Sequence, residues 1–226
     1  MKLNVKYIDN YIEFENGFVN CLEIENKNYF YKIVNDLNCV ANGEIIDEIL
    51  FTDNDYKEIS LTNKIDIVFD YFNFDFNSKK IILSLNRKVN ENLSIDKRDS
   101  LSKLYEKIKK IYTPIINEFD MNLSLNSDFD LDIVIKLLNI SINKKDNILD
   151  NLLLLIDIEK ELCLNKLLIF VNLKQYLSKS ELVELYKYLL YNNIDVLLID
   201  SQAYGVNNEY EKKLIIDEEL EEYLIV

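Results

Sequence analysis

The sequence predicts an α/β fold, and three features of its last third carry that prediction. Two segments, 166–172 (KLLIFVN) and 194–200 (IDVLLID), are apolar over the length of a strand. The segments 148–162 and 178–192 carry apolar residues at helical spacing, so helices and strands alternate. Strands that are apolar on both faces are typical of parallel sheets covered by helices on both sides. We therefore expect 166–172 and 194–200 to form a parallel pair within an α/β layer.

The remaining strands and one helix are expected near the two ends of the chain. Alternating or β-branched segments predict strands at 2–8, 19–24, 44–51, 64–70, 213–216 and 222–226. Helical spacing predicts a helix at 28–40. The simplest architecture is an α/β body formed by residues 1–74 and 141–226, with a helical insertion at 75–140.

Helical periodicity dominates the insertion. Ser78 is placed to cap a first helix, Asp96 a second, and Pro114 should end or kink the second helix. The apolar face of the first helix comprises Ile81, Ile82, Leu85 and Val89. That of the second comprises Leu101, Leu104, Tyr105, Ile108, Ile111 and Tyr112. In the last third, Ser178 and Glu181 have the spacing of a capping box, which predicts that the helix 178–192 begins there.

One long stretch is cationic although the protein as a whole is acidic. The chain carries 26 Lys and Arg against 40 Asp and Glu, a formal charge of −14. Residues 79–110 hold ten basic and four acidic side chains, a charge of +6, so the other residues sum to −20 (16 basic minus 36 acidic). Both arginines, Arg87 and Arg98, lie in this stretch. Salt confines the influence of each charge to about 8–10 Å, so a local basic face can bind phosphate on an acidic protein.

The composition excludes several classes of protein. Apolar residues make up 49%, which excludes global disorder. The longest apolar run, 152–156, is too short to span a bilayer, and the first ten residues lack the apolar core of a signal peptide. We therefore expect a cytoplasmic protein with no membrane partner. Cys21, Cys39 and Cys163 are odd in number and lack metal-type spacing, so buried, reduced thiols are expected.

The residue types needed for the common catalytic sites are missing. The three glycines, Gly17, Gly43 and Gly205, belong to neither a P-loop nor a GxGxxG pattern, so no nucleotide cofactor is expected. The chain has no histidine, which removes His-based nucleophile activation, acid–base catalysis and metal ligation. No Ser, Cys or Lys stands in a recognisable catalytic arrangement. We expect a protein without catalytic residues that is not an enzyme.

An acidic passage at 117–132 follows the cationic stretch. No basic residue lies between Lys110 and Lys136. Five carboxylates stand there: Glu118, Asp120, Asp128, Asp130 and Asp132. Oxygen-rich sets of this kind suit calcium or magnesium, but the passage lacks the turn glycine and distal glutamate of an EF-hand. The residues alone leave two interpretations open, a metal site and a solvated acidic turn beside a helix.

Basic residues follow one side of each helix predicted in the insertion. Lys103, Lys107 and Lys110 fall at i, i+4 and i+7, away from the apolar seam. Lys80, Arg87 and Lys88 lie away from the apolar face of the preceding helix. Such stripes suit contacts to the backbone of duplex DNA without reading of base sequence. The alternative is that these lysines only keep the helices solvated, and the contrast between +6 and −20 favours binding.

The order and spacing of several segments resemble one protein family. Residues 165–200 (NKLLIFVNLKQYLSKSELVELYKYLLYNNIDVLLID) are similar to the C-terminal part of the small type II-A CRISPR-associated spacer-acquisition protein. The resemblance extends to MKLN at the start, FDFNS at 74–78, the acidic turn, and the closing LIIDEELEEYLIV. It covers essentially the whole length, and its specificity comes from order, spacing and size together.

The resemblance implies a fold and a function. The fold is a P-loop-ATPase-like α/β head with a degenerate nucleotide site and an inserted, extended α-helical leg. The function is non-catalytic binding of double-stranded DNA ends during acquisition of new spacers (CRISPR adaptation, a step of antiviral defence). Family members act as a calcium-stabilised homotetrameric ring with a lysine-lined hole. Their partners are the integrase pair and the RNA-guided nuclease of the same system.

The family's binding roles carry over to residues of the insertion. The DNA-binding role falls on Lys79, Lys80, Arg87, Lys88, Lys97, Arg98, Lys103, Lys107, Lys109 and Lys110. The calcium role falls on Glu118, Asp120, Asp128, Asp130 and Asp132. Within this acidic turn the chain has NLSLNS where the family is more acidic. Two other functions stay open: a metal-dependent nuclease that uses the same carboxylates, and a scaffold that binds only proteins.

Overall fold

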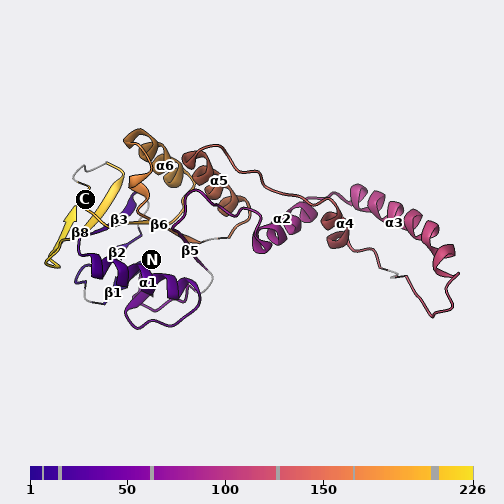
Figure 1. Cartoon of the computed structure of the whole chain (residues 1–226), viewed down its shortest axis with the longest axis horizontal. Coiled ribbons are helices and arrows are strands. Elements are labelled where there is room, and N and C mark those ends of the chain that lie inside the picture. The colour runs from indigo at the N-terminus through magenta and orange to yellow at the C-terminus, as the bar shows by residue number, and fades with distance from the viewer. Residues whose placement is uncertain are drawn as a thin grey trace. The chain divides into compact units, whose positions relative to one another are not determined.

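A computed structural model describes residues 1–6, 8–14, 17–61, 64–125, 128–164, 166–204 and 209–225 of the chain (Figure 1). It contains two compact units. The first, which we call the head, consists of Met1–Phe74 and Lys144–Val226. The second, which we call the leg, consists of Asp75–Asn143. The leg is therefore a single segment of chain inserted between the two segments of the head, and each unit is described by itself.

The head contains two β-sheets. The larger has the strand order β5-β6-β7-β3-β8-β9, in which β5, β6, β7, β3 and β8 are parallel and β9 is antiparallel. Its strands are β3 (Val19–Ile24), β5 (Ile65–Val68), β6 (Leu167–Val171), β7 (Val196–Asp200), β8 (Glu211–Ile216) and β9 (Glu222–Ile225). The smaller, antiparallel sheet has the order β2-β1-β4 and comprises β1 (Lys2–Val5), β2 (Ile12–Glu13) and β4 (Ile49–Thr52). The parallel pair predicted at 166–172 and 194–200 is confirmed as β6 and β7.

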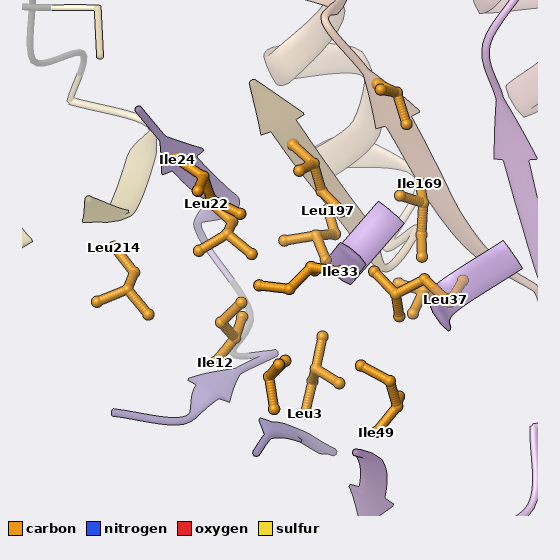
Figure 2. Packing of buried hydrophobic residues seen from close by; sticks show 14 of the residues in the cluster. Leu3, Ile12, Leu22, Ile24, Ile33, Leu37, Ile49, Ile169, Leu197 and Leu214 are labelled. Carbon is orange, nitrogen blue, oxygen red and sulfur yellow. The ribbon is translucent and has the colours of Figure 1, made fainter. Parts of the chain in front are cut away.

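One face of the larger sheet packs against helix α1 (Lys27–Ala41) and the smaller sheet. Figure 2 shows Leu22, Ile169 and Leu197 of the larger sheet meeting Ile33 and Leu37 of α1. The smaller sheet contributes Leu3, Ile12 and Ile49, which pack against the same cluster. Each such side chain stabilises the fold by about 1.5–3 kcal/mol when it is fully buried. This cluster is the main core of the head.

Helices α5 (Ile148–Glu161) and α6 (Lys179–Tyr191) lie on the side of the larger sheet opposite α1 (Figure 1). Because strand side chains alternate between faces, the neighbours of the residues in the main core, such as Leu168, Phe170 and Leu198, point to this second side and are fully buried. The helix α6 starts as predicted, with Ser178 as its N-cap and Glu181 completing a capping box.

The turn that leads from β3 into α1 is short. Only Glu25 and Asn26 separate the strand from the helix, and Asn26 caps α1 by accepting a hydrogen bond from the Tyr29 N–H at 3.1 Å. A phosphate-cradling loop needs several residues, glycines among them, between strand and helix. This two-residue turn therefore has no room for such a loop.

The described part of the leg contains three helices: α2 (Lys79–Glu91), α3 (Ile95–Ile116) and α4 (Leu131–Leu137). Ser78 caps α2 as predicted. The prediction that Asp96 caps the next helix is wrong, because the N-cap is Ser94 and Asp96 lies in the first turn. A carboxylate there is still favourable, since it faces the positive end of the helix dipole. Pro114 lies in the last turn of α3, which ends two residues later.

Two other expectations concern burial and membranes. Cys21 is buried and Cys39 is partly buried, but Cys163 is exposed, so the prediction of three buried thiols is wrong for Cys163. The reason is local: Cys163 has a positive φ of 50° in the turn directly after α5, at the surface of the head. All three thiols are free.

Within the ranges described above, no helix is long and apolar enough to cross a membrane.

Candidate nucleic-acid interface and metal-ligating residues

Three lysines form a continuous stripe along α3. At 100° per residue, Lys103, Lys107 and Lys110 fall within about 60° of one another around the helix and span about 10 Å of its length. All three are exposed. None forms an ion pair within the described part of the chain, where the only ion pair of α3 joins Lys109 to Glu106. The stripe is therefore a set of solvated ammonium groups available to an anionic partner.

The other basic residues of α3 differ in position or engagement. Lys97 is exposed but lies about 120° around the helix from Lys103. Lys109 is 3.0 Å from the Glu106 carboxylate and sits 5.6 Å from the centre of the Tyr105 ring. The Arg98 guanidinium donates from Nη2 to the Asn90 carbonyl oxygen at 2.8 Å and from Nε to the Leu93 carbonyl oxygen at 3.1 Å. Arg98 thus joins the start of α3 to the end of α2.

On α2, Lys80 and Arg87 lie on one side of the helix, and both are exposed. Arg87 Nε is 3.9 Å from Oε1 of Glu91, which lies one helical turn further along α2. Both side chains of this ion pair are largely exposed to solvent. Lys79, also exposed, and Lys80 stand in the first turn, where the helix dipole is positive. A phosphate at this end would meet both the lysines and the dipole. Lys88 is partly buried in the last turn.

The predicted metal ligands fall into two groups along the leg. Asp128 and Asp130 share a shallow hollow with Arg98, Asp99 and Ser102 of α3, and Phe129 between them contacts the Tyr105 ring, with centroids 5.7 Å apart. Glu118 and Asp120 follow the other end of α3. From Ser102 to Ile116 the helix rises about 20 Å. These contacts hold Asp128 and Asp130 beside the first half of α3, whereas Glu118 and Asp120 come after its last residue.

Two of the predicted ligands also serve the structure of α4. The Asp130 carboxylate caps α4 by accepting the Asp132 N–H at 2.8 Å, and Asp132 Oδ1 accepts from the Asn90 side chain of α2 at 2.8 Å. Among the residues that the structure describes, no three Asp, Glu or Cys side chains lie close enough to hold a metal ion. The calcium site therefore stays a prediction for these carboxylates.

Beyond the contact of Phe129 with Tyr105, most of the apolar side of α3 is uncovered by the residues of the leg that the structure describes. The helix contains no buried residue. Leu104 is 53% exposed, Ile108 43% and Ile111 65%, although their spacing is that of a helix face that packs. Exposed apolar surface of this extent is typical of a surface that contacts another macromolecule. Lysines lie on one side of α3 and an uncovered apolar seam on the other.

Sequence reasoning missed two structural roles in the leg. The pairing of Arg98 with the carbonyl oxygens of Asn90 and Leu93 has no signal in the residue spacing, because it depends on how the chain turns between α2 and α3. On α2 the spacing predicts that Val89 packs, but Val89 is 36% exposed and Asn86 and Asn90 are buried. The reason is that α4 packs on the side of α2 that carries the two asparagines. A polar pair such as Asn90 and Asp132 can be recognised only once both helices are placed.

Two comparisons with known sequences agree on one family, and a solved structure shares the fold. The sequence model of the family described as CRISPR-associated protein (Cas_Csn2) matches residues 44–220. The CRISPR-associated protein Csn2 of Enterococcus faecalis is 25% identical over 224 residues, which is 96% of each chain. The crystal structure of Stu0660 of Streptococcus thermophilus is similar in fold, with a TM-score of 0.65 and 15% identity, over 98% of this chain and 76% of that one.

Proposed function

This chain belongs to the CRISPR-associated protein family Cas_Csn2, and on that premise we propose that it acts in the acquisition of new spacers as a non-catalytic protein that binds the ends of double-stranded DNA. It binds without reading base sequence. The observation that carries the proposal is the stripe of exposed lysines on α3, Lys103, Lys107 and Lys110. A stripe of point charges suits phosphates, which every DNA sequence presents alike.

The charge distribution supports contact with duplex through this stripe. Outside residues 79–110 the chain sums to −20, so most of its surface repels DNA, whereas the stretch itself carries +6. Each lysine that meets a phosphate releases condensed counterions, which makes binding favourable and steeply dependent on salt. Lys80 and Arg87 on α2 would extend the contact beyond α3.

In the proposed active form four copies make a ring around the duplex. The uncovered apolar seam of α3 supports assembly, because burying it against another copy removes apolar surface from water. A closed arrangement of identical copies repeats the lysine stripe around a central axis. The head would be P-loop-ATPase-like with a lost nucleotide site, in keeping with the two-residue turn between β3 and α1. The integrase pair and RNA-guided nuclease of the same system are the proposed partners.

Calcium would stabilise this ring through Glu118, Asp120, Asp128, Asp130 and Asp132. Asp128 and Asp130 lie beside the first half of α3, and Glu118 and Asp120 follow its end. An ion shared between carboxylates of neighbouring copies would neutralise charges that otherwise repel one another across the assembly. Hard oxygen ligands of this type suit calcium.

Gel-shift titrations test the threading of DNA ends. Linear duplex and covalently closed circular duplex of the same sequence are titrated with protein in calcium and in chelator. We expect binding of the linear form in calcium, weaker binding in chelator, and little binding of closed circles. Equal affinity for closed circles would overturn threading.

The DNA should also remain uncut over hours with Mg²⁺, as expected of a non-catalytic protein.

Replacing Lys103 and Lys107 by alanine tests the stripe itself. We expect weaker binding of linear duplex and a shallower dependence on salt, because the slope of log K against log salt falls by about 0.9 for each phosphate that the protein no longer neutralises. The matched control replaces the exposed lysines Lys57 and Lys179 of the head, which changes net charge equally. If both double variants bind alike, the stripe is not the contact surface, and a scaffold that binds only proteins is favoured.

A further inference from the structure

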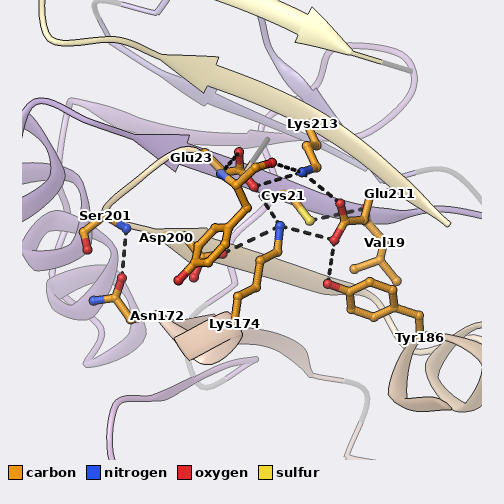
Figure 3. A network of polar contacts seen from close by, with 11 residues as sticks. Val19, Cys21, Glu23, Asn172, Lys174, Tyr186, Asp200, Ser201, Glu211 and Lys213 are labelled. Carbon is orange, nitrogen blue, oxygen red and sulfur yellow. Dashed lines mark hydrogen bonds and ion pairs between the residues drawn. The ribbon is translucent and has the colours of Figure 1, made fainter. Parts of the chain in front are cut away.

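Five charged side chains share a buried space on the α6 side of the larger sheet (Figure 3). They are Glu23 of β3, Lys174 of the short 3-10 helix Leu173–Gln175, Asp200 of β7, and Glu211 and Lys213 of β8. Each is at most 7% exposed. Lys174 Nζ lies 2.8 Å from Glu23 Oε1 and 3.2 Å from Glu211 Oε1, and Lys213 Nζ lies 3.1 Å from both carboxylates. Two lysines and two glutamates therefore neutralise one another.

Asp200 is the fifth member and has no such partner. It is fully buried, and among the described residues no side chain donates a hydrogen bond to either carboxylate oxygen; the backbone N–H of Lys174 is close enough to lower its pKa. The closest ammonium group is Lys174 Nζ at 3.9 Å, and that group already serves Glu23 and Glu211. With every group ionised, three carboxylates would face two ammonium groups. A buried carboxylate without compensation is strongly unfavourable.

We propose that Asp200 keeps its proton in the folded head up to near-neutral pH, that this proton balances the charge of the network, and that the head loses stability as pH rises towards that range, because folding must then take up a proton that the unfolded chain has released. A neutral carboxyl group removes the excess negative charge without moving any other side chain. Glu23 and Glu211 are poor sites for the proton, because each has two ammonium groups within 3.2 Å.

The groups around Asp200 support this assignment from each neighbouring element. Burial raises the pKa of Asp200 to about 7; Lys174 lowers it, and Glu23 and Glu211 raise it. On α6, the Tyr186 hydroxyl donates to Glu211 Oε1 at 2.7 Å, so it satisfies Glu211 and not Asp200. Burial lowers the pKa of Lys174, but Cys21, Glu211 and Glu23 raise it overall, so the ammonium group stays charged. The other titratable groups near Asp200 are the Cys21 thiol and the phenols of Tyr71 and Tyr204. Burial raises the pKa of each of them, so they stay neutral.

The direction of the pH effect follows from proton linkage. In the unfolded chain an aspartate loses its proton near pH 3.9, whereas folded Asp200 keeps it to about pH 7. Between these values the folded state binds one more proton, so stability falls as pH rises, and above pH 7 the loss is complete. Histidine is the side chain that ordinarily titrates between pH 5 and 8, and the chain has none.

Urea unfolding between pH 5 and pH 8.5 tests the proposal with three proteins. Asp200→Asn keeps the shape of the side chain without its charge, and Asp47→Asn removes an exposed aspartate of the head as control. Relative to Asp200→Asn, the unfolding constant of the wild type should increase about tenfold per pH unit up to pH 7 and level off above it. Asp47→Asn should follow the wild type. Parallel profiles for the wild type and Asp200→Asn would overturn the proposal.

Carbon-13 NMR of protein labelled at aspartate carboxyl groups tests it without relying on the folding of a variant. One aspartate carboxyl of the folded wild type should titrate near neutral pH. Burial also raises the pKa of Asp195, so Asp195→Asn serves as control and should retain this titration. If every aspartate carboxyl other than Asp195 is ionised at pH 5.5, the proposal fails.

Discussion

The Arg98 guanidinium donates to the carbonyl oxygen of Asn90, in the last turn of α2, and to that of Leu93, just beyond the end of the helix. Carbonyl groups in the last turn of a helix lack intrahelical partners, so a side chain that reaches them stabilises the helix end. The positive charge also complements the negative end of the helix dipole. Arg98 carries a charge that suits DNA, but two of its five N–H donors already hold the end of α2 to the start of α3.

Replacing Arg98 by lysine should therefore loosen the leg. A single ammonium group cannot reproduce two divergent N–H donors, and we expect a loss of about 1 kcal/mol. Hydrogen exchange of backbone amides at the end of α2 and the start of α3 measures this, and the exchange should become severalfold faster. Lys97→Arg, which changes a neighbouring basic residue without that role, is the control. Unchanged exchange in Arg98→Lys would show that the two hydrogen bonds contribute nothing.

The first turn of α6 is stabilised by a capping box, in which Ser178 and Glu181 hydrogen-bond to each other. Ser178 Oγ accepts the Glu181 N–H at 3.4 Å, and Glu181 Oε2 accepts the Ser178 N–H at 2.8 Å and its hydroxyl at 2.6 Å. Hydrogen bonds from the Ser178 side chain and backbone lower the pKa of Glu181. A carboxyl group with a lowered pKa stabilises the fold above its unfolded pKa, and this contribution is lost as pH falls.

Ser178→Ala should cost about 1 kcal/mol of head stability, the usual effect of removing an N-cap side chain. Urea unfolding at neutral pH measures the loss. The difference from the wild type should shrink in acid, because the Ser178–Glu181 pair needs the ionised carboxylate. Lys179→Ala, which changes the first residue of the helix without touching the cap, is the control. A difference that stays constant down to pH 3 would contradict the role of the Glu181 carboxylate.

Elements specified by local pattern could be predicted from the sequence, and those specified by tertiary contacts could not. The strands β6 and β7 and the cap of α6 follow from apolar runs and from the spacing of Ser178 and Glu181. The two-residue strand β2 is too short to give a pattern. The buried lysines Lys174 and Lys213 read as surface charges until Glu23 and Glu211, distant in sequence, are placed beside them.

The candidate site was predictable to the same degree. Helical phasing correctly separated the Lys103 stripe from the apolar residues of α3, because phase depends on spacing alone. Whether that apolar face is covered depends on what packs there, and within the leg it stays exposed. Whether the carboxylates meet depends on the path of the chain after α3, which residue types do not encode.

At the scale of the whole molecule, each copy has an uncovered apolar seam on α3 and a strongly acidic remainder. The seam favours association through burial of apolar surface. The net charge of −14 opposes it, because copies repel one another over about a Debye length. Association should therefore depend on cations, and calcium bound by the acidic passage is the proposed one.

Mass in solution tests this balance, and Leu104→Glu isolates the seam. Light scattering of the wild type should shift towards four protomers in calcium and towards smaller species in chelator. Leu104→Glu should stay small in both, because it places a charge on surface that must lose water, while glutamate keeps the helix intact. Leu220→Glu is the matched control, since Leu220 in the head is 48% exposed against 53% for Leu104. If Leu104→Glu still assembles in calcium, the ring is not built through α3. The proposal that the lysine stripes of four copies surround a duplex would then lose its support.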